Sequence, residues 1–228
     1  MFLKLYRRFI IFVDWLCFAV YVRTFEVVGK ENVPLDGPLI LVSNHLNNAD
    51  PPALALAVPR LPTYMAKREM IGWPVLGLAF RLFGAFPVRR GETDVAAIRM
   101  ASEVVARGDM LVMFPEGTRS RTGGLTKGHR GTALSALRTG APILPVAVTG
   151  SEAIRWPWLF LKPLSIRRIK VTIGEPFHLP PVGRADNEAA QQATDFIMRR
   201  IAALLPEQYR GVYADVEQPQ EAPAGRVY

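Results

Sequence analysis

Three short, almost purely apolar runs constrain the fold of this chain more than any other feature; they lie at residues 39–42, 110–114 and 143–148. Runs of this kind are typical of strands buried on both faces, as in a parallel sheet covered by helices. Segments with helical features lie between and after them, at residues 50–58, 93–106, 132–138 and 188–205. We therefore predict an α/β fold with a largely parallel central sheet flanked by helices.

Weaker signals supply the remaining elements. Short strands are predicted at residues 25–28, 63–66 and 85–88, an apolar helix at 73–83, and an edge strand at 168–173, where charged and apolar residues alternate. The length of 228 residues suits one domain, which we place at residues 25–210. Residues 211–228 are rich in Gln, Pro, Glu and Ala and are expected to form a disordered tail.

The N-terminus (residues 1–24) is a separate unit. Residues 9–22 are apolar except for Asp14, and as a helix they cover about 21 Å, short of the ~30 Å hydrocarbon core of a bilayer. The basic residues Lys4, Arg7 and Arg8 precede this run. The pattern favours a helix that lies in the membrane interface, with its basic residues at anionic headgroups. A helix packed on the core and a signal peptide are the alternatives.

The overall charge restricts the partners of the chain. It has 28 Lys and Arg against 20 Asp and Glu, and its pI is about 10.0. This balance favours anionic partners, such as nucleic acid, acidic lipid or a phosphorylated substrate. The single cysteine, Cys17, excludes an internal disulfide. The chain also lacks a Cys and His cluster with the spacing of a metal site, so no metal is expected.

The pair His45 and Asp50 carries the clearest chemical signal. It lies in the run SNHLNNAD, directly after the buried strand at residues 39–42. An imidazole can accept a proton near neutral pH, and a carboxylate beside it fixes its tautomer and stabilises the cation. No serine nucleophile accompanies the pair, so a substrate hydroxyl is the simplest nucleophile. The alternatives are a structural buried histidine and a helix cap formed by Asp50.

Positive charges gather where the predicted strands end. The segment FPEGTRS (114–120) follows the strand at 110–114, and a glycine among polar donors there suits the binding of an anion. The basic residues near the strand ends are Lys67, Arg68, Arg89, Arg90, Arg119 and Arg121. Together they predict a phosphate-binding region, because guanidinium groups bind phosphate oxygens with fork geometry.

The order NHLNNAD, FGAFPVRR, FPEGTRSRTG and ILPVAV resembles the glycerolipid acyltransferase family, in particular the bacterial 1-acylglycerol-3-phosphate O-acyltransferases. The resemblance spans about residues 39–150. It implies transfer of a fatty acyl group from acyl-CoA or acyl-carrier protein to the free hydroxyl of 1-acylglycerol-3-phosphate (lysophosphatidic acid), which gives phosphatidic acid. It further implies a peripheral or monotopic enzyme on the cytoplasmic face of the cell membrane, with membrane lipid as a partner and no cofactor beyond the acyl donor.

The resemblance also assigns residues by position. His45 matches the catalytic base of the family and Asp50 its charge partner. The residues that match the substrate-binding positions are Lys67, Phe86, Arg90, Glu116, Gly117, Thr118 and Arg119. One departure is visible in the block FPVRR, where Arg89 stands at a position that is acidic or neutral in many members, so either Arg89 or Arg90 meets the phosphate.

Two other functions are compatible with parts of the sequence. Another lysolipid, such as a lyso-ornithine lipid or a different lysophospholipid, is an alternative acceptor. A module that binds nucleic acid or anionic lipid without catalysis would use the positive charge alone. That module leaves the His45–Asp50 spacing and the apolar N-terminal helix unexplained, so no nucleic-acid partner is expected.

Overall fold

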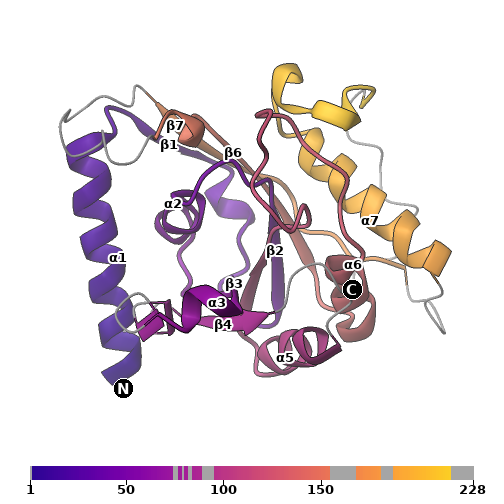
Figure 1. The fold of residues 1–228 in the computed structure, drawn as a ribbon, viewed down its shortest axis with the longest axis horizontal. Helices are drawn as coiled ribbons and strands as arrows, with labels where there is room; N and C mark the ends of the chain where they lie inside the picture. Colours follow the sequence, from indigo (N-terminus) through magenta and orange to yellow (C-terminus); the bar gives the residue numbers. More distant parts are fainter. Residues whose placement is uncertain are drawn as a thin grey trace.

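The computed structural model describes residues 2–73, 77–78, 80–81, 84–88, 95–154, 168–180 and 187–216. Its centre is a seven-stranded sheet with the strand order β1-β7-β6-β2-β5-β3-β4 (Figure 1). The strands are β1 (Phe25–Val28), β2 (Leu39–Ser43), β3 (Pro62–Lys67), β4 (Ala85–Val88), β5 (Met110–Met113), β6 (Ile143–Thr149) and β7 (Ile169–Ile173). The contiguous block from β6 to β4 is parallel, as is the β1–β7 pair, whereas β6 and β7 pair antiparallel. The predicted α/β fold with a largely parallel sheet is confirmed.

Helices cover both faces of this sheet (Figure 1). They are α1 (Phe2–Tyr21), α2 (Asp50–Ala57), α3 (Arg68–Ile71), α5 (Val95–Ala106), α6 (Gly131–Thr139) and α7 (Asn187–Ala202). Short 3-10 helices are η1 (Lys30–Asn32), η2 (Ser151–Ala153), η4 (Glu207–Tyr209) and η5 (Gly211–Tyr213). The helix predicted at 73–83 lies partly outside the described residues.

The central strand β2 shows how the two faces are filled. All five of its residues are buried, because helices cover it from both sides. Leu39 and Leu41 join the core formed with α2, whereas Ile40 and Val42 join the core formed with α5, α6 and α7. This alternation follows from the two-residue period of a strand. The end of β2 is therefore held rigidly at the middle of the molecule.

The structure corrects the edge strand predicted at 168–173. β7 lies inside the sheet, parallel to β1 and antiparallel to β6. Its apolar residues are buried, and the Lys170 ammonium lies 3.3 Å from a carboxylate oxygen of Glu26 on β1. The neighbouring strand thus supplies the countercharge, so alternating charge did not mark an edge here.

The predicted disordered tail also begins too early. Residues 211–216 fold back onto the domain, where Tyr213 and Val216 are buried in the core on the α7 side. The polar composition of the segment concealed these two apolar anchors. Residues 217–228 lie outside the described part of the chain.

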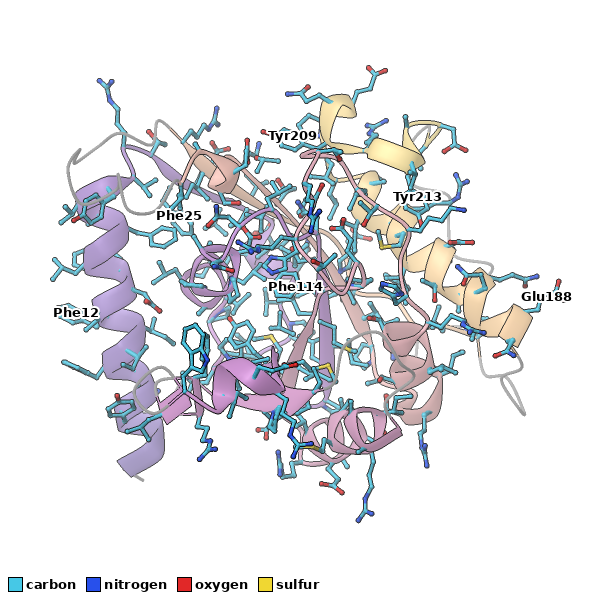
Figure 2. All side chains as sticks on the ribbon, in the orientation of Figure 1. Phe12, Phe25, Phe114, Glu188, Tyr209 and Tyr213 are labelled. Atoms are coloured by element: carbon cyan, nitrogen blue, oxygen red, sulfur yellow. The ribbon has the colours of Figure 1, made fainter. Side chains whose placement is uncertain are left out.

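Helix α1 lies along the outer flank of the molecule and contacts α2 (Figure 1). Phe18 and Tyr21 pack against the core, while Phe9, Phe12 and Trp15 are each more than half exposed. Figure 2 shows Phe12 pointing away from the body of the protein. Across the described residues, no helix has the length and apolar character needed to cross a bilayer.

Burial raises the pKa of the Asp14 carboxyl on α1 to about 6. Its Oδ2 atom is buried and has no hydrogen-bond partner among the described residues. Because the neutral acid is favoured in the folded state, its contribution to stability is present below pH ~4 and is lost as the pH rises through about 6.

We therefore expect Asp14→Asn to raise the melting temperature relative to the wild type at pH 7.5, where the buried carboxylate is ionised. The difference should shrink at pH 4, where the wild-type carboxyl is neutral. Thermal unfolding followed by circular dichroism at several pH values measures both. A difference that is independent of pH would mean that this carboxyl is solvated in the folded protein.

Candidate active site

The segment 44–50 leaves the end of β2 and holds both predicted catalytic residues. Asn44 fixes its start, because its side-chain amide donates to the Val148 carbonyl and accepts from the Val148 amide, both at 2.8 Å. Asn47 fixes its middle, since its Nδ2 donates to the Ile154 carbonyl at 2.9 Å. The segment is thus tied to β6 and to the residues that follow it.

The structure brings His45 and Asp50 into direct contact. His45 Nδ1 lies 2.8 Å from Asp50 Oδ2, and the two side chains are 8% and 0% exposed. A carboxylate next to Nδ1 favours the tautomer that carries its proton on Nδ1, which leaves Nε2 free to accept a proton. This arrangement suits a general base.

Asp50 does more than hold the ring. Its Oδ2 also accepts hydrogen bonds from the amides of Leu46 and Asn47, each at 2.7 Å. The predicted cap at the start of α2 is not formed by this carboxylate: Ala49 occupies the cap position without a side-chain bond. The carboxylate points back at the turn before its own helix, because that is where the buried donors are.

Two further contacts surround His45, one aromatic and one polar, and neither was predicted from the sequence. The ring of Phe114 stacks on the imidazole at 4.2 Å between centroids and an interplanar angle of 22° (Phe114 is labelled in Figure 2). The amide of Ser120 donates to the His45 carbonyl at 2.7 Å. Phe114 directly precedes the run PEGTR, and this position is the sequence feature that could have indicated its contact with His45.

Glu116 is buried, with 1% of its surface exposed, and it faces the protein. Its Oε1 accepts from the His45 amide at 3.0 Å, and its Oε2 accepts from the amide and the hydroxyl of Thr126, both at 2.9 Å. Burial raises the pKa of this carboxyl, and the hydrogen bonds from Thr126 and His45 oppose the rise. A direct contact of Glu116 with substrate stays a prediction.

The rest of the block turns outward. Gly117 has φ +65°, and a Cβ atom there would lie 2.8 Å from the Cδ2 atom of His129, so glycine is required on both counts. Thr118 and Arg119 are exposed beyond this turn. The turn therefore presents the Thr118 hydroxyl and the Arg119 guanidinium to solvent. Both residues directly precede Ser120, whose amide contacts His45.

The other predicted site residues are less informative. Lys67 ends β3, and its side chain lies outside the described part, as do Arg89 and Arg90. Phe86 on β4 packs against the core on the α5 side. The described residues contain no group of three His, Cys or carboxylate side chains placed to hold a metal ion.

Fold and site define a class: an α/β protein with a buried histidine–carboxylate pair at the end of its central strand. The family model described as Acyltransferase matches residues 24–149. The 1-acyl-sn-glycerol-3-phosphate acyltransferase of Pseudomonas aeruginosa is 30% identical over 206 residues, 87% of this chain and 77% of that protein. This chain belongs to the acyltransferase family.

Other comparisons agree in part. A chloroplastic 1-acyl-sn-glycerol-3-phosphate acyltransferase of Brassica napus is 30% identical over 154 residues, 65% of this chain but 44% of that protein. A lyso-ornithine lipid O-acyltransferase of Pseudomonas aeruginosa is 32% identical over 136 residues, 59% of this chain and 52% of that protein. The chain thus spans about half the length of these two relatives.

A solved structure also matches. The crystal structure of the 1-acyl-sn-glycerophosphate acyltransferase PlsC from Thermotoga maritima has a TM-score of 0.64 and 27% sequence identity. The match covers 85% of this chain and 75% of that protein. The resemblance found in the sequence motifs is therefore confirmed at the level of the family and the fold.

We expect His45→Ala to lower kcat for acyl transfer by at least about 10²–10³-fold, because a positioned general base acts on the chemical step. Asp50→Asn should also be severely impaired, since the imidazolium loses its countercharge. The matched control is His178→Ala, which removes an exposed histidine remote in sequence from the pair. Steady-state kinetics on proteins with wild-type circular dichroism make the comparison, and a folded His45→Ala enzyme within threefold of wild type would exclude this base.

Proposed function

We propose that this protein transfers a fatty acyl group from acyl-CoA or acyl-carrier protein to the free hydroxyl of 1-acylglycerol-3-phosphate, which gives phosphatidic acid. The observation that carries the proposal is the 2.8 Å contact between His45 Nδ1 and Asp50 Oδ2 at the end of β2. The names of the relatives at about 30% identity support the acceptor.

The chemistry runs through a hydroxyl that the substrate brings. His45 Nε2 removes the proton of the acceptor hydroxyl as its oxygen attacks the thioester carbonyl carbon. The new C–O ester bond forms, the C–S bond breaks, and the departing thiolate takes the proton from the imidazolium. Asp50 stabilises the cation between these two proton transfers, and Phe114 holds the ring plane.

Direct transfer suits this chain better than a covalent acyl-enzyme. The sequence contains no Gly-x-Ser-x-Gly elbow, and its one cysteine, Cys17, belongs to α1. A base without a protein nucleophile is the arrangement that a hydroxyl-bearing substrate completes. Both substrates are then bound together when the acyl group moves.

Arg119 is our candidate for the acceptor phosphate. It is exposed one residue before Ser120, whose amide is bonded to the His45 carbonyl. A guanidinium one residue from this contact of His45 can bind a phosphate monoester while the hydroxyl approaches Nε2. Thr118 adds a hydroxyl donor on the same turn.

A lyso-ornithine lipid is the second candidate acceptor, and the 32% identity to a lyso-ornithine lipid O-acyltransferase favours it. That headgroup carries an amine and a carboxylate in place of a phosphate monoester. The two acceptors therefore make different demands on Arg119.

The deciding experiment supplies radiolabelled acyl-CoA, and separately acyl-carrier protein, with a panel of lysolipids. We expect labelled phosphatidic acid from 1-acylglycerol-3-phosphate as the main product. Arg119→Ala should raise the KM for this acceptor by about tenfold or more, because a charge-assisted hydrogen bond contributes roughly 1.5–3 kcal/mol. A main product from lyso-ornithine lipid would assign the second acceptor, and a rise in the donor KM alone would place Arg119 at the donor.

We also propose that α1 docks the enzyme on the cytoplasmic face of the cell membrane, as a peripheral protein. Its outward side carries Phe9, Phe12, Trp15 and Leu16, each at least half exposed. The acceptor carries a long acyl chain, and extracting it into water costs about 0.8 kcal/mol per CH₂. Docking removes that cost, because the chain stays partly in lipid while the glycerol end enters the site.

Replacing Phe9, Phe12 and Trp15 together by Ser should reduce co-sedimentation with anionic vesicles by at least about tenfold, since each large side chain contributes roughly 1.5–3 kcal/mol when buried. Turnover on bilayer substrate should fall with it, while turnover on a short-chain, dispersed lysolipid stays within about threefold. Leu35→Ser is the matched control, because Leu35 is 69% exposed and lies outside α1. Vesicle binding equal to wild type would mean that α1 only packs on the core.

A further inference from the structure

The C-terminal segment that we expected to begin as a disordered tail lies against the loop that carries the active-site block. We call residues 206–216 the C-terminal strap and residues 114–130 the β5–α6 loop. The strap lies outside residues 24–149, where the family model matches. It contains η4 and η5, and it crosses the β5–α6 loop next to α7.

The strap holds the main chain of Leu125 from both sides. The Leu125 amide donates to the Tyr209 carbonyl at 2.9 Å, and the Val212 amide donates to the Leu125 carbonyl at 3.1 Å. The two backbones touch at Gly211, where φ is +52° and a Cβ atom would lie 2.1 Å from the Leu125 carbonyl oxygen. Only a residue without a side chain allows this approach.

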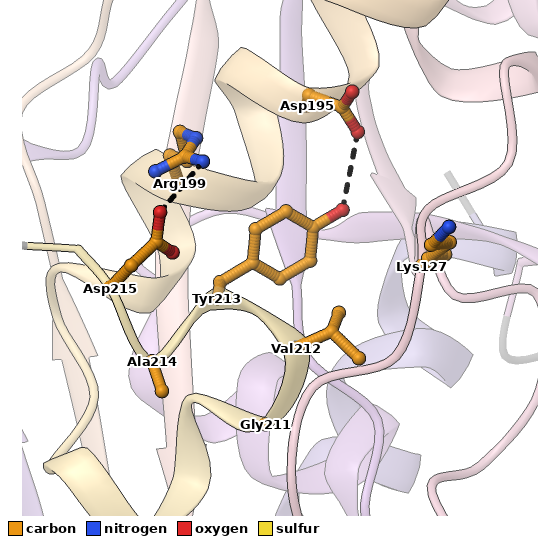
Figure 3. A pocket seen from close by; sticks show the side chains of 8 residues that line it. All are labelled: Lys127, Asp195, Arg199, Gly211, Val212, Tyr213, Ala214 and Asp215. Carbon is orange, nitrogen blue, oxygen red and sulfur yellow. Dashed lines mark hydrogen bonds and ion pairs between the residues drawn. The ribbon is translucent and has the colours of Figure 1, made fainter.

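Three side-chain contacts tie the strap, among its other bonds, to α7 and η2. Figure 3 shows two of them on α7: the Tyr213 hydroxyl donates to Asp195 at 3.3 Å, and Arg199 pairs with Asp215 at 3.1 Å. These residues, with Lys127, surround a cavity of about 540 Å³. The third is the contact of the Tyr209 hydroxyl with Glu152 on η2.

The contact between Tyr209 and Glu152 is a short hydrogen bond. The Tyr209 hydroxyl donates to Glu152 Oε1 at 2.6 Å. Burial, together with this hydrogen bond, raises the pKa of Tyr209 to about 12, so the phenol keeps the proton that it donates. The strap is therefore anchored both to α7 and to η2.

Two short chains of hydrogen bonds lead from Leu125 and its neighbours to His45. In the first, Thr126 donates its amide and hydroxyl to Glu116, and Glu116 accepts the His45 amide. In the second, the Gly124 carbonyl accepts the Ser120 hydroxyl at 2.6 Å, and the Ser120 amide donates to the His45 carbonyl. The amide and the carbonyl of His45 are thus each linked to a neighbour of Leu125. Glu116 links the amide to Thr126, and Ser120 links the carbonyl to Gly124.

We propose that the C-terminal strap is a positioning element of the active site, which sets the main chain of His45 through Leu125, Glu116 and Ser120. It touches neither the acyl donor nor the acceptor in this role. Loosening it shifts the imidazole relative to Asp50 and to the reacting oxygen, and such a shift lowers kcat more than it changes substrate binding. The kinetic part rests on the proposed function, in which His45 is the base.

The first test replaces Gly211 by Ala, which pushes the strap away from Leu125. We expect kcat to fall by at least about tenfold with both KM values within threefold, because misplacing a catalytic group by ~1 Å costs up to about 10²-fold. Gly140→Ala is the matched control: φ is +64° there, but no atom lies within 4 Å of the added Cβ. It carries the same backbone strain and should leave kcat within twofold of wild type.

A second pair of variants tests one link without disturbing the strap. Thr126→Val removes the hydroxyl that donates to Glu116 and keeps the shape, and it should lower kcat. Thr126→Ser keeps the hydroxyl and should restore kcat to within about twofold of wild type. If Thr126 only filled space, Thr126→Ser would lower kcat more than Thr126→Val, because serine is the smaller residue.

A readout that needs no turnover separates this proposal from the proposed function. The Nδ1 proton of His45, held between the ring and Asp50, should give a downfield proton resonance that is absent in His45→Ala. We expect that resonance to shift or broaden in Gly211→Ala and to stay unchanged in Gly140→Ala. Wild-type protein without acyltransferase activity would contradict the proposed function but not the role of the strap. A folded Gly211→Ala protein with wild-type kcat, or with an unchanged resonance, would overturn the role of the strap.

Discussion

A buried carboxylate must find hydrogen-bond donors, because an unpaired one costs several kcal/mol, and two such groups organise this molecule. Asp50 collects its donors from the His45 ring and from the amides of Leu46 and Asn47. Glu116 collects them from the His45 and Thr126 amides and the Thr126 hydroxyl. His45 lies between the two carboxylates, so its side chain and its main chain are fixed by different parts of the sequence. The contacts of Asp50 are local to the segment after β2, whereas the contact of Glu116 with His45 forms only when the loops after β2 and β5 come together.

The sheet supplies the frame for that arrangement. β2 pairs with β5 and β6 in parallel, so the three strands end on the same edge, and residues 44–50 and 114–120 leave from neighbouring positions. All of β2 is buried, and a buried central strand belongs to the part of a fold that opens least readily. A general base benefits from this rigidity, because proton transfer depends on sub-ångström placement of the ring.

Much of the fold and of the site could be predicted from the sequence. The features that could not be predicted share one physical reason. The apolar runs located the buried strands, and the five-residue spacing of His45 and Asp50 predicted their contact, since both are local patterns. Phe114 and Glu116 both contact His45, from which they are distant in sequence, and the strap contacts Leu125, which is also distant from it; backbone amides moreover carry no sequence signature. Alternating charge at 168–173 suggested an edge because the countercharge, Glu26, lies on a strand distant in sequence.

The pairing of β1 with β7 has a consequence for how the protein is made. β1 ends at Val28 and pairs along its whole length with a strand that begins at Ile169. At a synthesis rate of about 5–20 residues per second, β7 leaves the ribosome roughly 7–30 s after β1. During that interval α1 has been synthesised while the strand that follows it still lacks its neighbour. The helix that we propose docks on the membrane is therefore available to lipid before the sheet closes, and the nascent chain can complete its fold with this helix already docked.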